Sequence, residues 1–242
     1  MQPAHAIHAI PGFAEPVSSM THLLAAGIAL ALGIVLVIRA GRSASHRAAL
    51  AVFVFGTVNM FAMSGVFHLL SPGGTPRHVL LLLDHAGIWV MIAGTCTPLY
   101  VLLARGWTRW SMLTLVWAVS VTGLVLKTVF FDTVPEWLSL SLYLSLGGFI
   151  GWSVWHLIRE RPQVARLFVL GSAAYIVGSV LDLLRVPVIV PGVVGPHELF
   201  HLAILAAVCC HWTMIGQLAR TAELTANLAP SPPLEATIAV GT

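Results

Sequence analysis

The chain has 242 residues, of which 58% are hydrophobic and only 9% are charged. A soluble domain needs roughly a quarter of its residues charged to cover its surface. This composition therefore excludes a soluble globular protein and indicates one that is embedded in lipid. The net charge of +3 is small and scattered along the chain, which excludes a nucleic-acid-binding surface.

Seven apolar runs are each long enough to cross the hydrocarbon core of a bilayer, which takes about 20 helical residues. The predicted spans are 18–38, 48–70, 79–104, 110–131, 137–158, 164–184 and 197–219. The breaks between them are short and rich in Gly, Pro, Ser and Arg, so no connection holds a separate folded domain. We predict an all-α integral membrane protein, a seven-transmembrane helix bundle over residues 1–220, followed by a disordered C-terminal tail over 221–242.

Basic residues are distributed unequally between the two ends of this bundle. Nine of the twelve Lys and Arg residues lie in the connections after the first, third and fifth spans, near the start of the sixth span, or at the end of the last one. Basic residues near the ends of spans mark the cytoplasmic side. We therefore predict a multi-pass protein of the cell membrane with an external N-terminus and a cytoplasmic C-terminus.

Polar side chains within the spans concentrate in one leaflet. An ionisable group in a membrane span is costly, so each one is a candidate functional residue. In an up-and-down bundle, the starts of odd-numbered helices and the ends of even-numbered helices lie on the same side. That side receives Glu15, His22, Ser64, His68, Asp84, His85, Lys127, Asp182, His197, Glu198 and His201. A single polar site is the simplest interpretation.

Two histidines of the last span have the spacing of a metal-binding pair. His197 and His201 are four positions apart, which places both imidazoles on one helix face, one turn apart. His68 near the end of the second span can complete a three-histidine set, and Ser64 precedes it by one turn. Three histidines and a water are a ligand set of catalytic zinc. Imidazole also binds nickel, copper and iron, but this set favours Zn²⁺ as the cofactor.

Five motifs occur in the order of a known family. They are Glu15 followed by Thr21-His22, Ser64-Gly-Val-Phe-His68, Asp84-His85-Ala-Gly-Ile88 with Ala93-Gly-Thr-Cys-Thr-Pro98, Gly123-Leu-Val-Leu-Lys127, and His197-Glu-Leu-Phe-His201. In this order they resemble the motifs of the hemolysin III-like branch of the progestin and adipoQ receptor (PAQR) family. The resemblance implies a seven-helix bundle with zinc held by three histidines, which correspond to His68, His197 and His201.

The resemblance also implies that Ser64 and Asp84 lie near the zinc, with Asp84 orienting a water. Two positions depart from the family pattern: Ser18 stands where Asn is usual, and Asp182 stands where an aromatic residue is common. Asp182 makes the pocket more acidic, and we expect it to pair with Lys127 or Arg185. The receptor members are similar to this chain only in the core, so adiponectin or progestin binding is not implied.

The leading hypothesis is a zinc-dependent hydrolase, similar to an amidase or ceramidase, that acts on a lipid amide or related acyl bond. Zinc lowers the pKa of a bound water to about 7 and polarises a carbonyl. Asp84 would orient or deprotonate the water, and Ser64 would hydrogen-bond the substrate or the developing oxyanion. The expected second-shell or pocket residues are Glu15, His22, His85, Lys127, Asp182 and Glu198. A membrane lipid is the expected substrate, and the sequence indicates neither a protein partner nor an oligomeric state.

Three other interpretations stay open at this point. A structural zinc would need the same ligands, so a non-enzymatic regulator or sensor of membrane homeostasis fits the sequence too. An intramembrane metalloprotease would use the His-Glu-Leu-Phe-His motif with Glu198 as general base, but it leaves His68 and Ser64 without a role. A pore or transporter would place polar groups along a path through the bilayer, and the concentration in one leaflet does not favour it.

Overall fold

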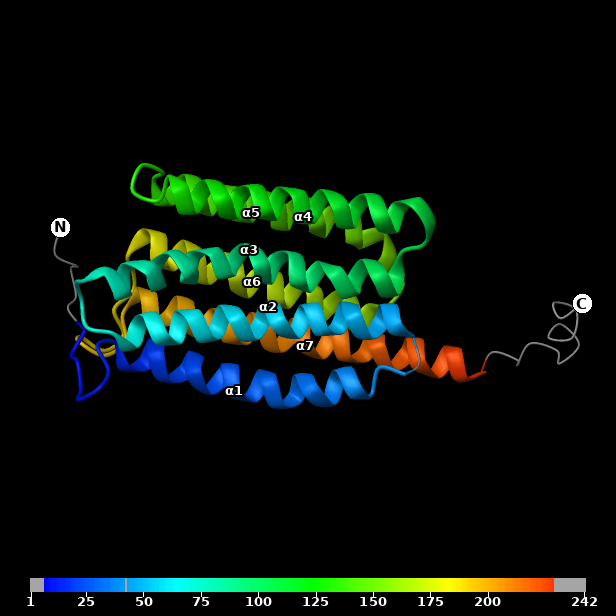
Figure 1. Cartoon of the computed structure of the whole chain (residues 1–242), viewed down its shortest axis with the longest axis horizontal. Coiled ribbons are helices and arrows are strands. Elements are labelled where there is room, and N and C mark those ends of the chain that lie inside the picture. The colour runs from blue at the N-terminus through cyan, green and yellow to red at the C-terminus, as the bar shows by residue number, and fades with distance from the viewer. Residues whose placement is uncertain (1–6, 42, 229–242) are drawn as a thin grey trace, which may run out of the picture.

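The computed structural model describes residues 7–41 and 43–228, which form a bundle of seven helices (Figure 1). The helices are α1 Pro16–Ile38, α2 Ala44–Leu69, α3 Thr75–Leu103, α4 Gly106–Val129, α5 Glu136–Ile158, α6 Pro162–Leu184 and α7 Pro196–Leu228. All seven are long and apolar enough to cross a membrane. The predicted seven-helix membrane bundle is therefore confirmed, and each predicted span overlaps one of these helices, with the second, third and fourth spans extending one or two residues past the helix end.

The last helix is longer than the sequence analysis predicted. The disordered tail was expected to begin at residue 221, but α7 continues to Leu228. Residues 221–228 contain neither Gly nor Pro and include Ala, Leu and Glu, which favour helix. The predicted start of the tail was wrong for this reason, and the remainder of the predicted tail, 229–242, lies outside the described residues.

The helices pack as neighbours in a defined order. α2 contacts α1 and α3, while α7 contacts α6, α1 and α3. α4 packs on α3, α5 packs on α6 and α3, and both lie on the side of the bundle opposite α1 (Figure 1). Glycines bring α2 and α3 into close approach. A Cβ built on Gly56 would lie 3.1 Å from the carbonyl oxygen of Val90, and one on Gly94 would lie 3.2 Å from that of Val52. Small residues allow membrane helices this backbone proximity.

Hydrogen bonds attach the start of α1 to the end of α2. The Glu15 N–H donates to the carbonyl oxygen of His68 over 3.0 Å, and the Ala14 N–H donates to that of Leu69 over 3.2 Å. One turn further into the membrane, the buried Ser19 hydroxyl donates to the carbonyl oxygen of Gly65 over 2.8 Å. These bonds place the Glu15 carboxylate beside the last turn of α2, where His68 lies.

Candidate metal centre

Three histidines from two helices converge at one end of the bundle. The Nε2 atom of His197 lies 3.4 Å from Nε2 of His68 and 3.1 Å from Nε2 of His201. One ligand atom from each of the three residues lies within 4.8 Å of the other two. His68 belongs to the last turn of α2, and the other two histidines occupy successive turns at the start of α7. The structure thus brings together the three predicted ligands.

A carboxylate orients the His68 ring. Nδ1 of His68 contacts the Glu15 carboxylate, whose other oxygen accepts a hydrogen bond from Arg77. Arg77 also donates to the carbonyl oxygen of Leu70, and its guanidinium lies over the Phe67 ring. Burial raises the pKa of Glu15, but the contacts of its carboxylate with His68 and Arg77 outweigh burial and lower the pKa to about 2. Glu15 is therefore an ionised acceptor for the Nδ1–H of His68.

A second carboxylate faces His197 in the same manner. Oδ1 of Asp182, near the end of α6, lies 3.3 Å from Nδ1 of His197. Arg185 approaches the same carboxylate oxygen to 3.9 Å and also donates to Glu136 over 2.8 Å. The expectation that Asp182 pairs with Arg185 therefore agrees with the structure.

The two carboxylate contacts fix the protonation of the His68 and His197 rings in a form that can bind a cation. Because a carboxylate accepts only, each contact places the ring proton on Nδ1, so Nε2 carries a lone pair. The Nε2 lone pairs of His68 and His197 then face each other at 3.4 Å, an unfavourable arrangement unless a positive charge lies between them. A tetrahedral zinc with bonds of about 2.0–2.1 Å holds its nitrogen ligands about 3.3–3.4 Å apart. The residues present fit such a metal.

A fourth histidine and a serine adjoin this set. The His22 ring stacks on the His201 ring, with centroids 4.1 Å apart and an angle of 23°. Nδ1 of His22 is 2.9 Å from the Ser64 hydroxyl oxygen. Both His22 and Ser64 are almost completely buried. Ser64 is therefore linked to the three histidines by His22, which contacts both the Ser64 hydroxyl and the His201 ring.

Glu198 has a structural role at the start of α7. One carboxylate oxygen accepts the Gly195 N–H over 2.9 Å, and the other accepts the Ser18 hydroxyl over 3.3 Å. An acid three positions into a helix commonly satisfies the free N–H before it in this way. Ser18 is the residue that links α1 to this acid. Both oxygens are occupied, which does not favour Glu198 as the general base of a protease.

Because Glu198 caps the start of α7, replacing it should change the stability of the protein. Glu198→Ala leaves the Gly195 N–H unsatisfied and should lower stability by about 1–3 kcal/mol, seen as a lower midpoint of thermal unfolding in detergent. Glu198→Gln keeps an acceptor oxygen and should unfold close to the wild-type temperature. Equal midpoints for wild type and Glu198→Ala would contradict this role.

The remaining predicted site residues form a neighbouring group. Asp84 lies 3.9 Å from Nδ1 of His85, and the His85 ring makes an edge contact with Phe131. The Lys127 ammonium lies over the same Phe131 ring at 4.3 Å, rather than beside Asp182. Among the described residues, no hydrogen bond, ion pair or ring contact joins this group to the three histidines. The structure places this group at the same end of the bundle as the three histidines, near the start of α3 and the end of α4.

Sequence reasoning missed Arg77. This residue lies in the first turn of α3, and in the sequence it counts only as one of the few basic residues on its side of the membrane. The sequence did indicate that such a residue exists, because Glu15 needs a cationic partner if it is to remain charged close to the membrane. That partner could be identified only once the fold had placed α3 next to the start of α1.

Most of the chain is similar in sequence to known proteins. The sequence profile of the family described as "Haemolysin-III related" matches residues 13–212. The chain is similar to the "Hemolysin-3" of Bacillus cereus, with 27% identity over 169 residues that cover 69% of this chain and 74% of that protein. It is equally similar to the "Hemolysin-3 homolog" of Bacillus subtilis (strain 168), with 27% identity over 169 residues, 69% of this chain and 76% of the relative. The range matched by the profile contains all three convergent histidines.

Proposed function

The chain belongs to the haemolysin-III-related family of membrane proteins, and from this premise we propose that it binds zinc and hydrolyses a lipid amide or related acyl bond. The observation that carries the proposal is the convergence of three Nε2 atoms from His68, His197 and His201. Carboxylates behind two of these rings direct the Nε2 lone pairs inward. Three histidines leave the fourth position of a tetrahedral zinc free for a water or a substrate.

The bound metal would supply a water of lowered pKa and would polarise a substrate carbonyl. In this proposal, Asp84 would accept a proton from that water. It accepts no hydrogen bond from the described residues, and its carboxylate makes one longer contact, 3.9 Å from Nδ1 of His85. When Nδ1 of His22 donates to Ser64, the serine proton is free to hydrogen-bond a substrate oxygen, where negative charge develops.

The position of the cluster favours a lipid substrate. The site lies at one end of the helices, where the headgroup and ester or amide region of a lipid is found. The His197 side chain is 38% exposed, whereas that of His68 is 2% exposed. One flank of the cluster is therefore accessible from outside the bundle, and its base is buried.

Turnover of a lipid amide tests this function. The zinc-loaded protein in neutral detergent should release fatty acid from a short-chain ceramide, lose the activity with a chelator and regain it with zinc. A zinc-containing protein that releases no fatty acid from amide or ester lipids would contradict the hydrolase. It would favour the alternative, a structural zinc that holds α2 against α7 in a non-enzymatic membrane protein.

The carboxylates behind the ligands yield a prediction about zinc affinity. Glu15→Gln and Asp182→Asn should each weaken zinc binding about 10–100-fold, because loss of a carboxylate behind a histidine lowers its basicity and frees its orientation. The measurement is competition with a chromophoric chelator, and Glu160→Gln, an exposed acid outside the cluster, is the control. Unchanged affinity in both variants would show that these acids do not support the ligands.

A further inference from the structure

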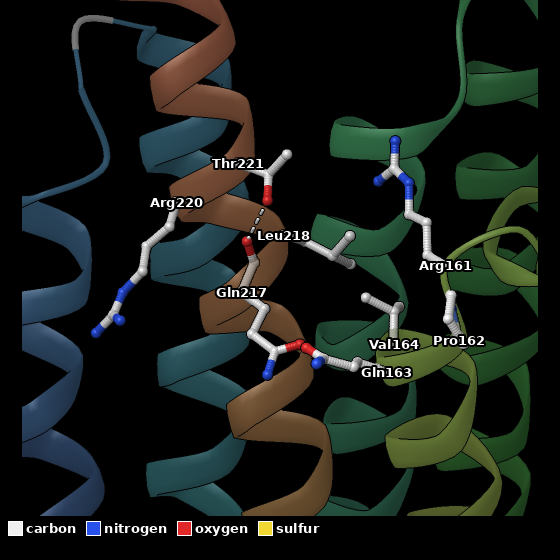
Figure 2. A pocket seen from close by; sticks show the side chains of 8 residues that line it. All are labelled: Arg161, Pro162, Gln163, Val164, Gln217, Leu218, Arg220 and Thr221. Atoms are coloured by element: carbon white, nitrogen blue, oxygen red, sulfur yellow. Dashed lines mark hydrogen bonds between the residues drawn. The ribbon is translucent and has the colours of Figure 1, made fainter.

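The end of the bundle opposite the three histidines contains a cavity. It lies between the start of α6 and the last turns of α7 and has a volume of about 560 Å³. Arg161, Pro162, Gln163, Val164, Gln217, Leu218, Arg220 and Thr221 line it (Figure 2). We call it the α6–α7 crevice. Gln217 comes sixteen positions after His201 in α7, which is about 24 Å of helix, so the crevice is distinct from the three-histidine cluster.

The crevice combines an apolar floor with a cationic, polar rim. Val164 and Leu218 are buried and extend toward one another from the two helices (Figure 2). Gln163 and Gln217 add amide groups, and Arg161 and Arg220 are exposed. Figure 2 shows Arg161 at the start of α6 and Arg220 extending from the other flank of α7. None of the described residues that line the crevice is acidic, so these residues give it a positive charge.

The arginines of the two ends differ in their partners. At the metal end, Arg77 contacts Glu15 and Arg185 contacts Glu136. In the part of the chain that the structure describes, Arg161 and Arg220 form no ion pair with a carboxylate. An arginine without an internal counter-ion is available for an external anion, and its fork of donors suits a phosphate.

We propose that the α6–α7 crevice binds an anionic phospholipid from the leaflet at the arginine-rich end. The phosphodiester would lie against Arg161 and the side-chain amides of Gln163 and Gln217, and the glycerol and upper acyl segments would lie over Val164 and Leu218, while Arg220 on the other flank of α7 adds positive charge. A basic pocket between membrane helices has the charge and the surface for such a headgroup. The apolar floor supplies a contact that a free phosphate ion would not use. This proposal does not depend on the hydrolase.

Lipid titration followed by native mass spectrometry tests the crevice. The full chain in neutral detergent should bind phosphatidylglycerol in preference to phosphatidylcholine of the same acyl composition. Arg161→Gln/Arg220→Gln should raise the apparent Kd for phosphatidylglycerol at least about fivefold, mainly because the direct contact of Arg161 with the phosphate is lost, and a basic side chain beside an anionic headgroup contributes a factor of about five. If the double variant does not fold, Arg161→Gln alone should show the roughly fivefold loss.

The matched control is Arg47→Gln/Arg105→Gln, which removes two exposed arginines of the same end outside the crevice. Its affinity for phosphatidylglycerol should stay near the wild-type value. Equal losses in both double variants would overturn the proposal and indicate diffuse attraction to the whole surface. No preference for phosphatidylglycerol, or its displacement by an excess of inorganic phosphate, would overturn it as well.

Discussion

Replacing both α7 histidines, His197→Ala together with His201→Ala, is expected to abolish zinc binding. Wild-type protein should contain about one zinc per chain and the variant less than about a tenth of that, because one remaining imidazole cannot hold the ion against water and chelator. The two rings occupy successive turns of one helix and share the cation with His68. Plasma mass spectrometry of purified protein measures the zinc content directly.

The control for this experiment is His156→Ala. His156 is exposed on α5, and its loss should leave the zinc content unchanged. Circular dichroism and size-exclusion chromatography establish that the double variant retains its helices and its oligomeric size. Zinc that stays at one per chain in a folded double variant would show that the metal lies elsewhere.

Asp84→Asn is expected to lower kcat/KM for lipid amide hydrolysis about 10²–10⁴-fold, the usual contribution of a general base. The amide is nearly isosteric with the carboxylate but cannot accept the water proton. Because Asp84 is not among the convergent ligand atoms, the zinc content should be unchanged. The measurement pairs initial rates on a short-chain ceramide with metal analysis of the same samples.

Asp132→Asn provides the matched control, since Asp132 is an exposed acid in the connection between α4 and α5 at the same end of the bundle. It should hydrolyse the substrate at the wild-type rate. Wild-type activity in Asp84→Asn would remove Asp84 from the chemistry. Loss of zinc in that variant would assign it to metal binding instead.

Much of this architecture could be predicted because lipid imposes simple rules. Each span needs about 20 apolar residues, and the seven runs correspond to the seven helices. The convergence of three histidines could be predicted as well, since the spacing of His197 and His201 fixes their common face and an up-and-down bundle places His68 in the same leaflet. The end of α7 was harder to locate, because helix propensity continues beyond the apolar run.

Contacts between side chains of different helices could not be predicted in the same way. Depth in the bilayer places Asp84 and Lys127 in the correct leaflet, but it does not give the rotation of their helices toward or away from the histidines. The metalloprotease-like pattern around Glu198 gave no indication that Gly195 and Ser18 occupy its carboxylate. Arg77 acquires its partner only through the packing of α3.

X-ray absorption at the zinc edge of the purified protein tests the central claim most directly. The claim predicts a zinc edge with three imidazole nitrogens at about 2.0–2.1 Å and one additional oxygen. The imidazole scattering should disappear in His197→Ala/His201→Ala. A freshly purified protein without a zinc edge, or a zinc with sulfur ligands at about 2.3 Å, would contradict the three-histidine centre.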